Sequence, residues 1–385
     1  MIKQPKIITI LLIIFILLLI PIGCWDNKEL EERAIVLGVA VDSSKTGDEI
    51  LLTVELPKFE AAGGNQAGQV EPVIMSNAGP AIFNTIRNFT FSLGKKLFWG
   101  NVAVVIVSQD FASKSIYPLI DFFARDPELR LSPFLVVAKD NNANNILKGI
   151  KGQTETMASQ QILGTIKSQK ETGEFATDNL HDFFEKLQAP GIQPVASVIE
   201  QAGGDKSYVV KGVAVFREDR VAGWLEMKEA KGYNWLTDNI KGGLIKVDYE
   251  QEKAVLVMEI VRSSTKPEIQ IVNEQIIFKP TIKVVVNIAE MDRAIDITSQ
   301  KSRENLKKAT EGEIREYLEG ALSKLQDIKS DAIGIGEYIY RNNPAYWKTV
   351  EADWDAEYFP LVKLEPDINV SIRHSGLMLK PTRLR

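Results

Sequence analysis

The fold is decided by residues 102–137, which read VAVVIVSQDFASKSIYPLIDFFARDPELRLSPFLVV. The apolar run Val102–Val107 predicts a buried strand, and Leu131–Val137 predicts a second one. Between them, apolar residues recur at the i, i+4, i+7 spacing of one helix face: Ile116, Ile120 and Phe123. A connection of about two dozen residues that contains a helix is typical of parallel strands. The stretch therefore predicts a right-handed βαβ unit.

The residues before this unit predict a hairpin and a helix. Two strand-like runs, Ile35–Asp42 and Ile50–Leu56, flank a loop that contains Gly47 and indicate a β-hairpin. A helix is expected to begin after Pro80, because apolar residues then recur with helical spacing: Ile82, Ile86 and Phe89. Residues 153–187, beyond the unit, are mostly polar and helical in pattern.

Two groups of chain-breaking residues indicate a domain boundary. Pro and Gly cluster at residues 189–194, and Gly203-Gly204-Asp205 follows shortly afterwards. We therefore expect an N-terminal domain over residues 24–200, with room for two subdomains, and a C-terminal domain over residues 206–385.

The second half predicts several adjacent strands and one long helix. Strand-like runs lie at residues 209–216, 221–225, 243–249, 254–261, 275–278, 281–288 and 368–372. Their short connections favour an antiparallel sheet. An apolar stripe predicts the helix: Ile314, Leu318, Ala321, Leu322, Leu325 and Ile328. The expected fold class is α+β, with several domains, mixed sheets and packed helices.

Composition excludes several classes of protein. The chain has 385 residues, 45% of them hydrophobic and 25% charged, which is typical of a folded globular protein. The 46 Lys and Arg residues are intermixed with 51 Asp and Glu residues, so a nucleic-acid-binding role is not expected. One cysteine rules out a disulfide framework and a multi-cysteine zinc site. We expect no cofactor and no metal.

The first 23 residues have the pattern of a secretory signal peptide. Lys3 and Lys6 precede an apolar run from Ile7 to Ile22, which is shorter than the roughly 20 apolar residues of a spanning helix. The sole cysteine, Cys24, follows directly after Gly23, and this junction resembles the lipobox of bacterial lipoproteins. In such proteins the cysteine carries the lipid. Pro21 departs from the usual leucine. The alternative is an uncleaved anchor with an incidental cysteine.

Removal of this segment makes the chain more acidic. Loss of Lys3 and Lys6 leaves 44 Lys and Arg against 51 Asp and Glu, a net charge of −7. An acidic body is repelled by an anionic membrane surface. We therefore expect the lipid on Cys24, not basic residues, to hold the protein at the membrane.

The sequence offers few candidate catalytic residues. His181 and His374 lie in separate halves, and no nucleophile, zinc or phosphate-loop motif occurs. Asp353 and Asp355 would share a face if they lay on a strand, which could serve glycoside chemistry, but a solvated edge with Trp354 buried is favoured. Aromatic residues between 338 and 359 could form a binding platform, although a core is the favoured interpretation.

Several stretches resemble the Ger(x)C spore germination lipoproteins. The segment Gly23-Cys24-Trp25-Asp26, followed by a short acidic helix and an apolar strand, resembles their mature start. Further matches in the same order are Phe98–Asn101, Asp121–Arg130, Gly212–Phe216 with Gly223–Leu225, and Asp331–Gly336 with Trp347, Trp354 and the terminal strand. The resemblance covers nearly the whole mature chain. It departs at Pro21 and at Asn101, where a histidine is common in the family.

The resemblance implies a lipid-anchored subunit of a spore nutrient germinant receptor. Members of the family work beside integral-membrane subunits at the spore inner membrane and are not known as enzymes. The resemblance also implies an α+β fold with several domains. Two other hypotheses remain open: a membrane-tethered solute-binding lipoprotein that binds a small nutrient directly, and an exported hydrolase.

The segment next to the lipid is a candidate partner contact. Trp25 and Leu30 would lie nearest the bilayer if Cys24 carries the anchor. The alternative is that the segment forms a short amphipathic helix that packs on its own domain.

Overall fold

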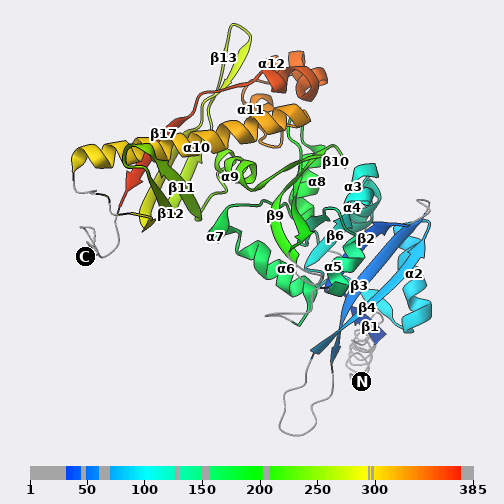
Figure 1. Ribbon diagram of the computed structural model, residues 1–385. Helices are drawn as coiled ribbons and strands as arrows, with labels where there is room; N and C mark the ends of the chain where they lie inside the picture. Colours follow the sequence, from blue (N-terminus) through cyan, green and yellow to red (C-terminus); the bar gives the residue numbers. More distant parts are fainter. Residues whose placement is uncertain are drawn as a thin grey trace, which may run out of the picture.

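The structure is a computed structural model that describes residues 32–44, 49–59, 70–125, 128, 130–149, 156–202, 208–293, 295 and 299–373. It has a mixed α+β architecture, as predicted, with a large sheet at one end and a smaller sheet under a long helix at the other (Figure 1).

The large sheet has eight strands in the order β10-β9-β8-β7-β6-β2-β3-β4. Its strands are β2 (Gly38–Ser43), β3 (Ile50–Phe59), β4 (Val70–Gly79), β6 (Val104–Ser108), β7 (Phe134–Ala138), β8 (Val195–Gln201), β9 (Tyr208–Arg217) and β10 (Arg220–Leu225). The central strands β2, β6, β7 and β8 run parallel, whereas the pairs at both edges are antiparallel. The predicted hairpin and the parallel pairing of the predicted βαβ unit are therefore confirmed.

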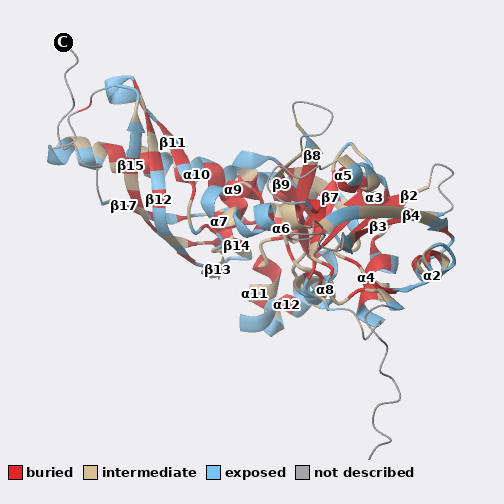
Figure 2. Cartoon of the chain, turned by 90° about the horizontal axis from the view of Figure 1, so that it is seen from below, coloured by how far each residue is buried: buried red, intermediate tan, exposed pale blue. Residues whose placement is uncertain are grey.

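Helices cover both faces of the large sheet (Figure 1). The helices of this half are α2 (Ile82–Leu93), α3 (Gln109–Lys114), α4 (Tyr117–Arg125), α5 (Ala143–Gly149), α6 (Ala158–Lys167), α7 (Gln169–Thr172) and α8 (Leu180–Gln188). One apolar cluster joins the sheet to α2, α3, α4 and α8, and a second joins it to α5 and α6. Figure 2 shows the resulting burial of the central strands, and β6 is buried at every position.

Two elements differ from the predicted boundaries. The run expected to form one strand from Ile35 to Asp42 begins as a separate short strand, β1 (Arg33–Ile35), which pairs in parallel with β5 (Lys96–Phe98). The chain then shifts into β2, and Leu37 N–H donates to Glu55 O at 2.9 Å. The single helix expected around Ile116 is divided into α3 and α4, with Ile116 buried between them.

The second half contains a four-stranded sheet in the order β11-β12-β15-β17. The main elements of this half are α9 (Met227–Leu236), β11 (Leu244–Tyr249), β12 (Ala254–Lys266), β15 (Thr281–Met291), α10 (Gln300–Ile328), α11 (Ile335–Asn342), α12 (Pro344–Val350) and β17 (Asp367–Ile372). A further small sheet combines β13 (Ile269–Val272), β14 (Gln275–Phe278) and β16 (Lys363–Leu364). The strands are mainly antiparallel, but β17 runs parallel to β15.

The two halves share a sheet and a core. Strand β9 pairs with β8, so the large sheet continues across residues 200–206, where the domain boundary is predicted. Val195, Val213 and Val215 of this sheet belong to the same apolar cluster as the inner face of α10. The division into domains 24–200 and 206–385 stays a prediction about folding units.

Helix α10 packs on α9 at a point where only glycine fits. A Cβ atom on Gly232 would lie 1.9 Å from Tyr317 O, which is far inside van der Waals contact. The close approach lets the Trp235 and Tyr317 rings stack at a centroid distance of 5.8 Å. The predicted apolar stripe of α10 is confirmed, since Ile314, Leu318 and Leu325 are fully buried.

Asp331 connects the end of α10 to the aromatic cluster of Trp347, Trp354 and Phe359. Its carboxylate is fully buried and accepts hydrogen bonds from Gly334 N at 2.9 Å, Ile335 N at 3.2 Å and Gly336 N at 2.7 Å. It also accepts one from Trp354 Nε1 at 3.0 Å. Burial raises the pKa of Asp331 to about 7, against the opposing effect of the three backbone donors.

The acidic pair near the C-terminus is not on a strand. Asp353 ends a 3₁₀ turn, and Asp355 lies in the π-helical turn Trp354–Tyr358. These turns allow Trp354 to pack into a local aromatic core. Asp355 Oδ1 accepts from Asp331 N at 2.9 Å and its Oδ2 accepts from Gln193 Nε2 at 2.8 Å, so this carboxylate links the Asp331 backbone to the Gln193 side chain. Trp354 is buried as expected, and Trp347 and Phe359 are buried with it as the core interpretation predicts, whereas Tyr340 of the same group is 44% exposed.

Gly232→Ala is expected to lower the free energy of unfolding by about 3 kcal/mol or more, because the added methyl must displace the α10 backbone. Urea-induced unfolding measures the effect. Gly320→Ala, in α10 with no neighbouring atom within 4 Å, is the matched control. This control should raise stability by up to about 1 kcal/mol through helix propensity. Equal stability of the two variants would contradict the proposed contact.

The pH dependence of stability is expected to reveal Asp331. Its pKa is raised from 3.8 to about 7, so its contribution is fully present below pH 3.8 and is lost as pH rises through 7. The free energy of unfolding of the wild type should therefore fall more steeply between about pH 4 and pH 7 than that of Asp331→Asn. The exposed Asp327→Asn in α10 is the control. Parallel profiles for all three proteins would refute this assignment.

Candidate functional site

A groove with a volume of 810 Å³ lies between α2, β5 and α4. Helix α2 forms one wall because its apolar residues Ile82 and Phe89 are buried against the sheet. Gly94 ends the helix in the left-handed region at φ 63°, and its N–H donates to Thr90 O. This turn directs the chain into β5, which forms the base of the groove.

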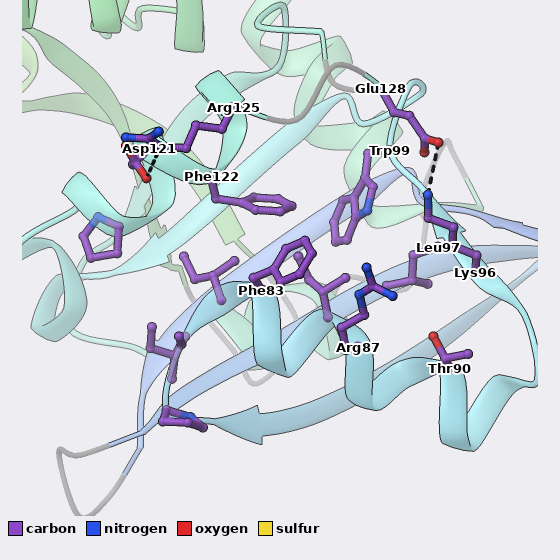
Figure 3. Close-up of a pocket in the computed structure, with 16 residues that line it drawn as sticks. Phe83, Arg87, Thr90, Lys96, Leu97, Trp99, Asp121, Phe122, Arg125 and Glu128 are labelled. Carbon is purple, nitrogen blue, oxygen red and sulfur yellow. Dashed lines mark hydrogen bonds and ion pairs between the residues drawn. The ribbon is translucent and has the colours of Figure 1, made fainter.

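Three aromatic rings meet in the groove (Figure 3). Trp99 packs edge-on against Phe122 of α4, with centroids 5.8 Å apart, and Phe83 of α2 lies 6.5 Å from Phe122. Trp99 is buried, whereas Phe83 is 53% exposed at the mouth of the groove. Such ring pairs add about 0.5–1.5 kcal/mol each beyond their buried area. The rings form an apolar surface that is only partly covered.

Charged side chains of both signs surround the rings. Arg125 Nε donates to both Asp121 carboxylate oxygens at 2.8 Å, and this contact raises the pKa of Arg125. Lys96 Nζ lies 3.1 Å from Glu128 Oε1 on the other side (Figure 3). The guanidinium of Arg87 lies 5.0 Å from the centroid of the Phe83 ring. Arg87 makes no ion pair with any other side chain that the structure describes.

The arrangement suits binding. Aromatic and arginine side chains in a partly open depression are the residue types that anchor protein contacts. The volume also falls within the roughly 300–1,000 Å³ of small-molecule sites. Within residues 32–373, as far as the structure describes them, no cluster of three or more His, Cys, Asp or Glu side chains could hold a metal ion.

The predicted site residues lie mostly outside the described chain. Cys24, Trp25, Leu30 and His374 all lie outside the described residues. His181 is in the first turn of α8, 57% exposed, with Nε2 3.4 Å from Glu185 Oε1. It lies on a different helix from those that line the groove.

The sequence does not predict the groove. The segments Phe98–Asn101 and Asp121–Arg130 resemble a family without indicating a site, and the structure brings Trp99 of the first segment against Phe122 of the second. Neither α2 nor Phe83 carried any signal for a site. The aromatic and charged content of the two segments was the available clue, but their contact depends on how α4 packs beside β5.

The groove lies beside the point at which the described chain begins. Strand β1 starts at Arg33, whose Cα pairs with that of Lys96 on the parallel strand β5. The Arg33 guanidinium lies 5.0 Å from the centroid of the Phe98 ring. The start of β1 therefore lies next to the groove, which Lys96 lines. No helix in the described part of the chain is long and apolar enough to cross a membrane.

Two family models match most of the chain. The model described as "Spore germination protein N-terminal domain" matches residues 26–201, and "Spore germination B3/GerAC like, C-terminal" matches residues 211–376. Both the groove and β1 lie within the first match.

Curated relatives and a solved structure agree with this result. Spore germination protein KC of Bacillus subtilis (strain 168) is 26% identical over 94% of this chain and 94% of that protein. Spore germination protein B3 of the same organism is 22% identical over 96% of this chain and 98% of its own. The crystal structure of the GerBC protein superimposes with a TM-score of 0.55 at 18% identity and covers 90% of this chain and 99% of that one. This likeness supports the fold.

Proposed function

The chain belongs to the spore germination B3/GerAC-like family, and from that premise we propose that it is a lipid-anchored subunit of a spore nutrient germinant receptor. In this proposal the lipid on Cys24 holds the body at the spore inner membrane, and the body acts by contact with integral-membrane receptor subunits. The proposal includes no enzymatic step.

The observation that carries this proposal is the aromatic groove beside β1. Phe83 is 53% exposed and its ring is covered on one side by Arg87, so a partner side chain could bury both. Buried aromatic and arginine residues at the centre of an interface contribute most of its binding energy. The position of the groove next to the tethered end favours a partner that is itself in the membrane, because tethering raises the local concentration of the two proteins.

Trp25 and Leu30 belong to the same proposal. They would lie between the lipid and the groove, where they could contact the same partner. The alternative, that this segment packs on its own domain, remains open.

A second function is favoured by the chemistry of the groove. Its aromatic floor and its cations and carboxylates together would suit a zwitterionic nutrient such as an amino acid. In that case the chain would bind the germinant directly as a solute-binding lipoprotein.

Cys24→Ala is expected to release the protein from membranes or to leave an uncleaved precursor, because the substitution removes the sulfur that carries the lipid. Membrane fractionation with mass spectrometry of the N-terminus measures the result. A single acyl chain binds membranes only marginally, so a diacylglyceryl group is expected on Cys24. An unmodified Cys24 in the mature protein would overturn the proposed anchor.

Phe83→Glu is expected to reduce co-purification with integral-membrane receptor subunits several-fold, because it places a carboxylate at the mouth of the apolar groove. Folding should be retained, since Phe83 is more than half exposed. Leu361→Glu, at a position that is 69% exposed in the second half, is the matched control and should assemble normally. Normal assembly of Phe83→Glu combined with loss of nutrient binding in calorimetry would favour the solute-binding function. Normal assembly with unchanged nutrient binding would exclude the groove from both.

A further inference from the structure

The outer face of α2 and of the turn that follows it carries an exposed ring between two cations. Arg87, Phe91 and Lys95 follow each other at four-residue spacing, and we call these three residues the α2 face. Phe91 is 90% exposed, more than any other large apolar side chain among the described residues. It does not line the groove. A single exposed apolar side chain is ordinary on a protein surface, so Phe91 indicates a contact only together with the charges near it and its place in the fold.

The charge of this segment is opposite to that of the chain. Residues 82–96 contain Arg87, Lys95 and Lys96 and no Asp or Glu, whereas the whole chain has a net charge of −5. Lys96 is paired with Glu128 at 3.1 Å. Lys95 is exposed and makes no ion pair within the described part of the chain. Arg87 and Lys95 therefore place positive charge four residues before and four residues after Phe91 in the chain, with the Arg87 guanidinium 5.0 Å from the centroid of the Phe83 ring.

The tether brings the α2 face close to the bilayer. β5 follows α2 after one turn and pairs with β1, so the start of the described body lies beside the end of α2. β1 and α2 lie at the same end of the molecule, and β17 lies at the opposite end (Figure 1). Eight residues lie between Cys24 and Arg33, and an extended chain over these nine residue steps spans at most about 30 Å. A lipid on Cys24 would hold this end within that distance of the membrane.

We propose that the α2 face rests on an anionic phospholipid surface, with Phe91 inserted at the level of the headgroups and Arg87 and Lys95 paired with phosphates. Apolar side chains beside cations are typical of segments that lie in a membrane interface. Here Arg87 and Phe91 belong to α2, which ends at Leu93, and Lys95 belongs to the turn that follows. Positive charge without neighbouring carboxylates complements anionic headgroups. The proposal rests on the proposed anchor for proximity, and it adds the orientation that a flexible tether alone does not impose.

This contact modifies the expectation that the lipid alone holds an acidic body. The overall charge opposes binding, but the few residues that face the bilayer attract it, because surface electrostatics are screened within about 10 Å. The groove then opens alongside the bilayer, since Arg87 belongs both to the α2 face and to the groove wall. Juxtamembrane segments of a membrane partner would lie at this level.

The test measures lipid contact at residue 91 in the full lipidated chain. Phe91→Cys, labelled with an environment-sensitive fluorophore, is reconstituted in phosphatidylglycerol vesicles that contain nitroxide-labelled lipid; the lipid-bearing Cys24 sulfur cannot react with the label. The matched control is Leu244→Cys on β11, a position that is 51% exposed at the other end of the molecule. We expect several-fold stronger quenching at residue 91 than at residue 244. Adding Lys95→Glu, or replacing phosphatidylglycerol by phosphatidylcholine, should reduce the difference.

Each other outcome overturns the proposal in a distinguishable way. Equal quenching at residues 91 and 244, in protein that floats with the vesicles, would show that the α2 face does not touch lipid although the anchor is intact. Protein that fails to float would overturn the anchor and the α2 contact together. If lipid does not quench residue 91, and residue 91 becomes shielded only when the membrane partner is present, the α2 face belongs to a protein interface.

Discussion

Buried carboxylates that accept hydrogen bonds from distant backbone N–H groups hold the layers of this protein in register. Asp42 on β2 accepts from Ala143 N at 2.7 Å and from Asn144 N at 2.9 Å, at the start of α5. Glu55 on β3 accepts from Ala158 N at 2.7 Å and from Ser159 N at 2.9 Å, at the start of α6. Each hydrogen bond to a charged group contributes about 1.5–3 kcal/mol, and the positive end of a helix favours the carboxylate further.

These contacts hold α5 and α6 on one face of the large sheet, and the groove forms on the other face. Burial raises the pKa of Asp42, while the α5 donors and Lys148 oppose that effect. With α5 and α6 held on one side, α2 and α4 pack on the other, and β5 lies between them as the base of the groove. Removal of Asp42 or Glu55 would leave the N–H groups of a helix start without an acceptor in an apolar layer.

The predicted elements were confirmed where one apolar period extended over many residues. The α10 stripe and the run that became β15 were of this kind, because burial on one face imposes its period on the sequence. The runs that became β6 and β7 were also predicted, but as continuous apolar runs, because nearly every position of these strands is buried. Prediction from sequence considered Asp353 and Asp355 on a strand as one possibility, and the structure places them in helical turns, where Trp354 is buried as expected and reaches Asp331. It also treated residues 35–42 as one strand, since nothing in that run indicates a change of partner from β5 to β2.

The sequence by itself determined the α+β class, the positions of most strands, the acidic charge and the resemblance to a family, because each of these depends on residues close together in the chain. Tertiary structure decided the rest. Trp99 and Phe122 meet only because α4 packs beside β5, and β9 joins the large sheet by pairing with β8 across the predicted boundary. Contacts of this kind depend on how separate elements are arranged in space, and local periodicity carries no information about that arrangement.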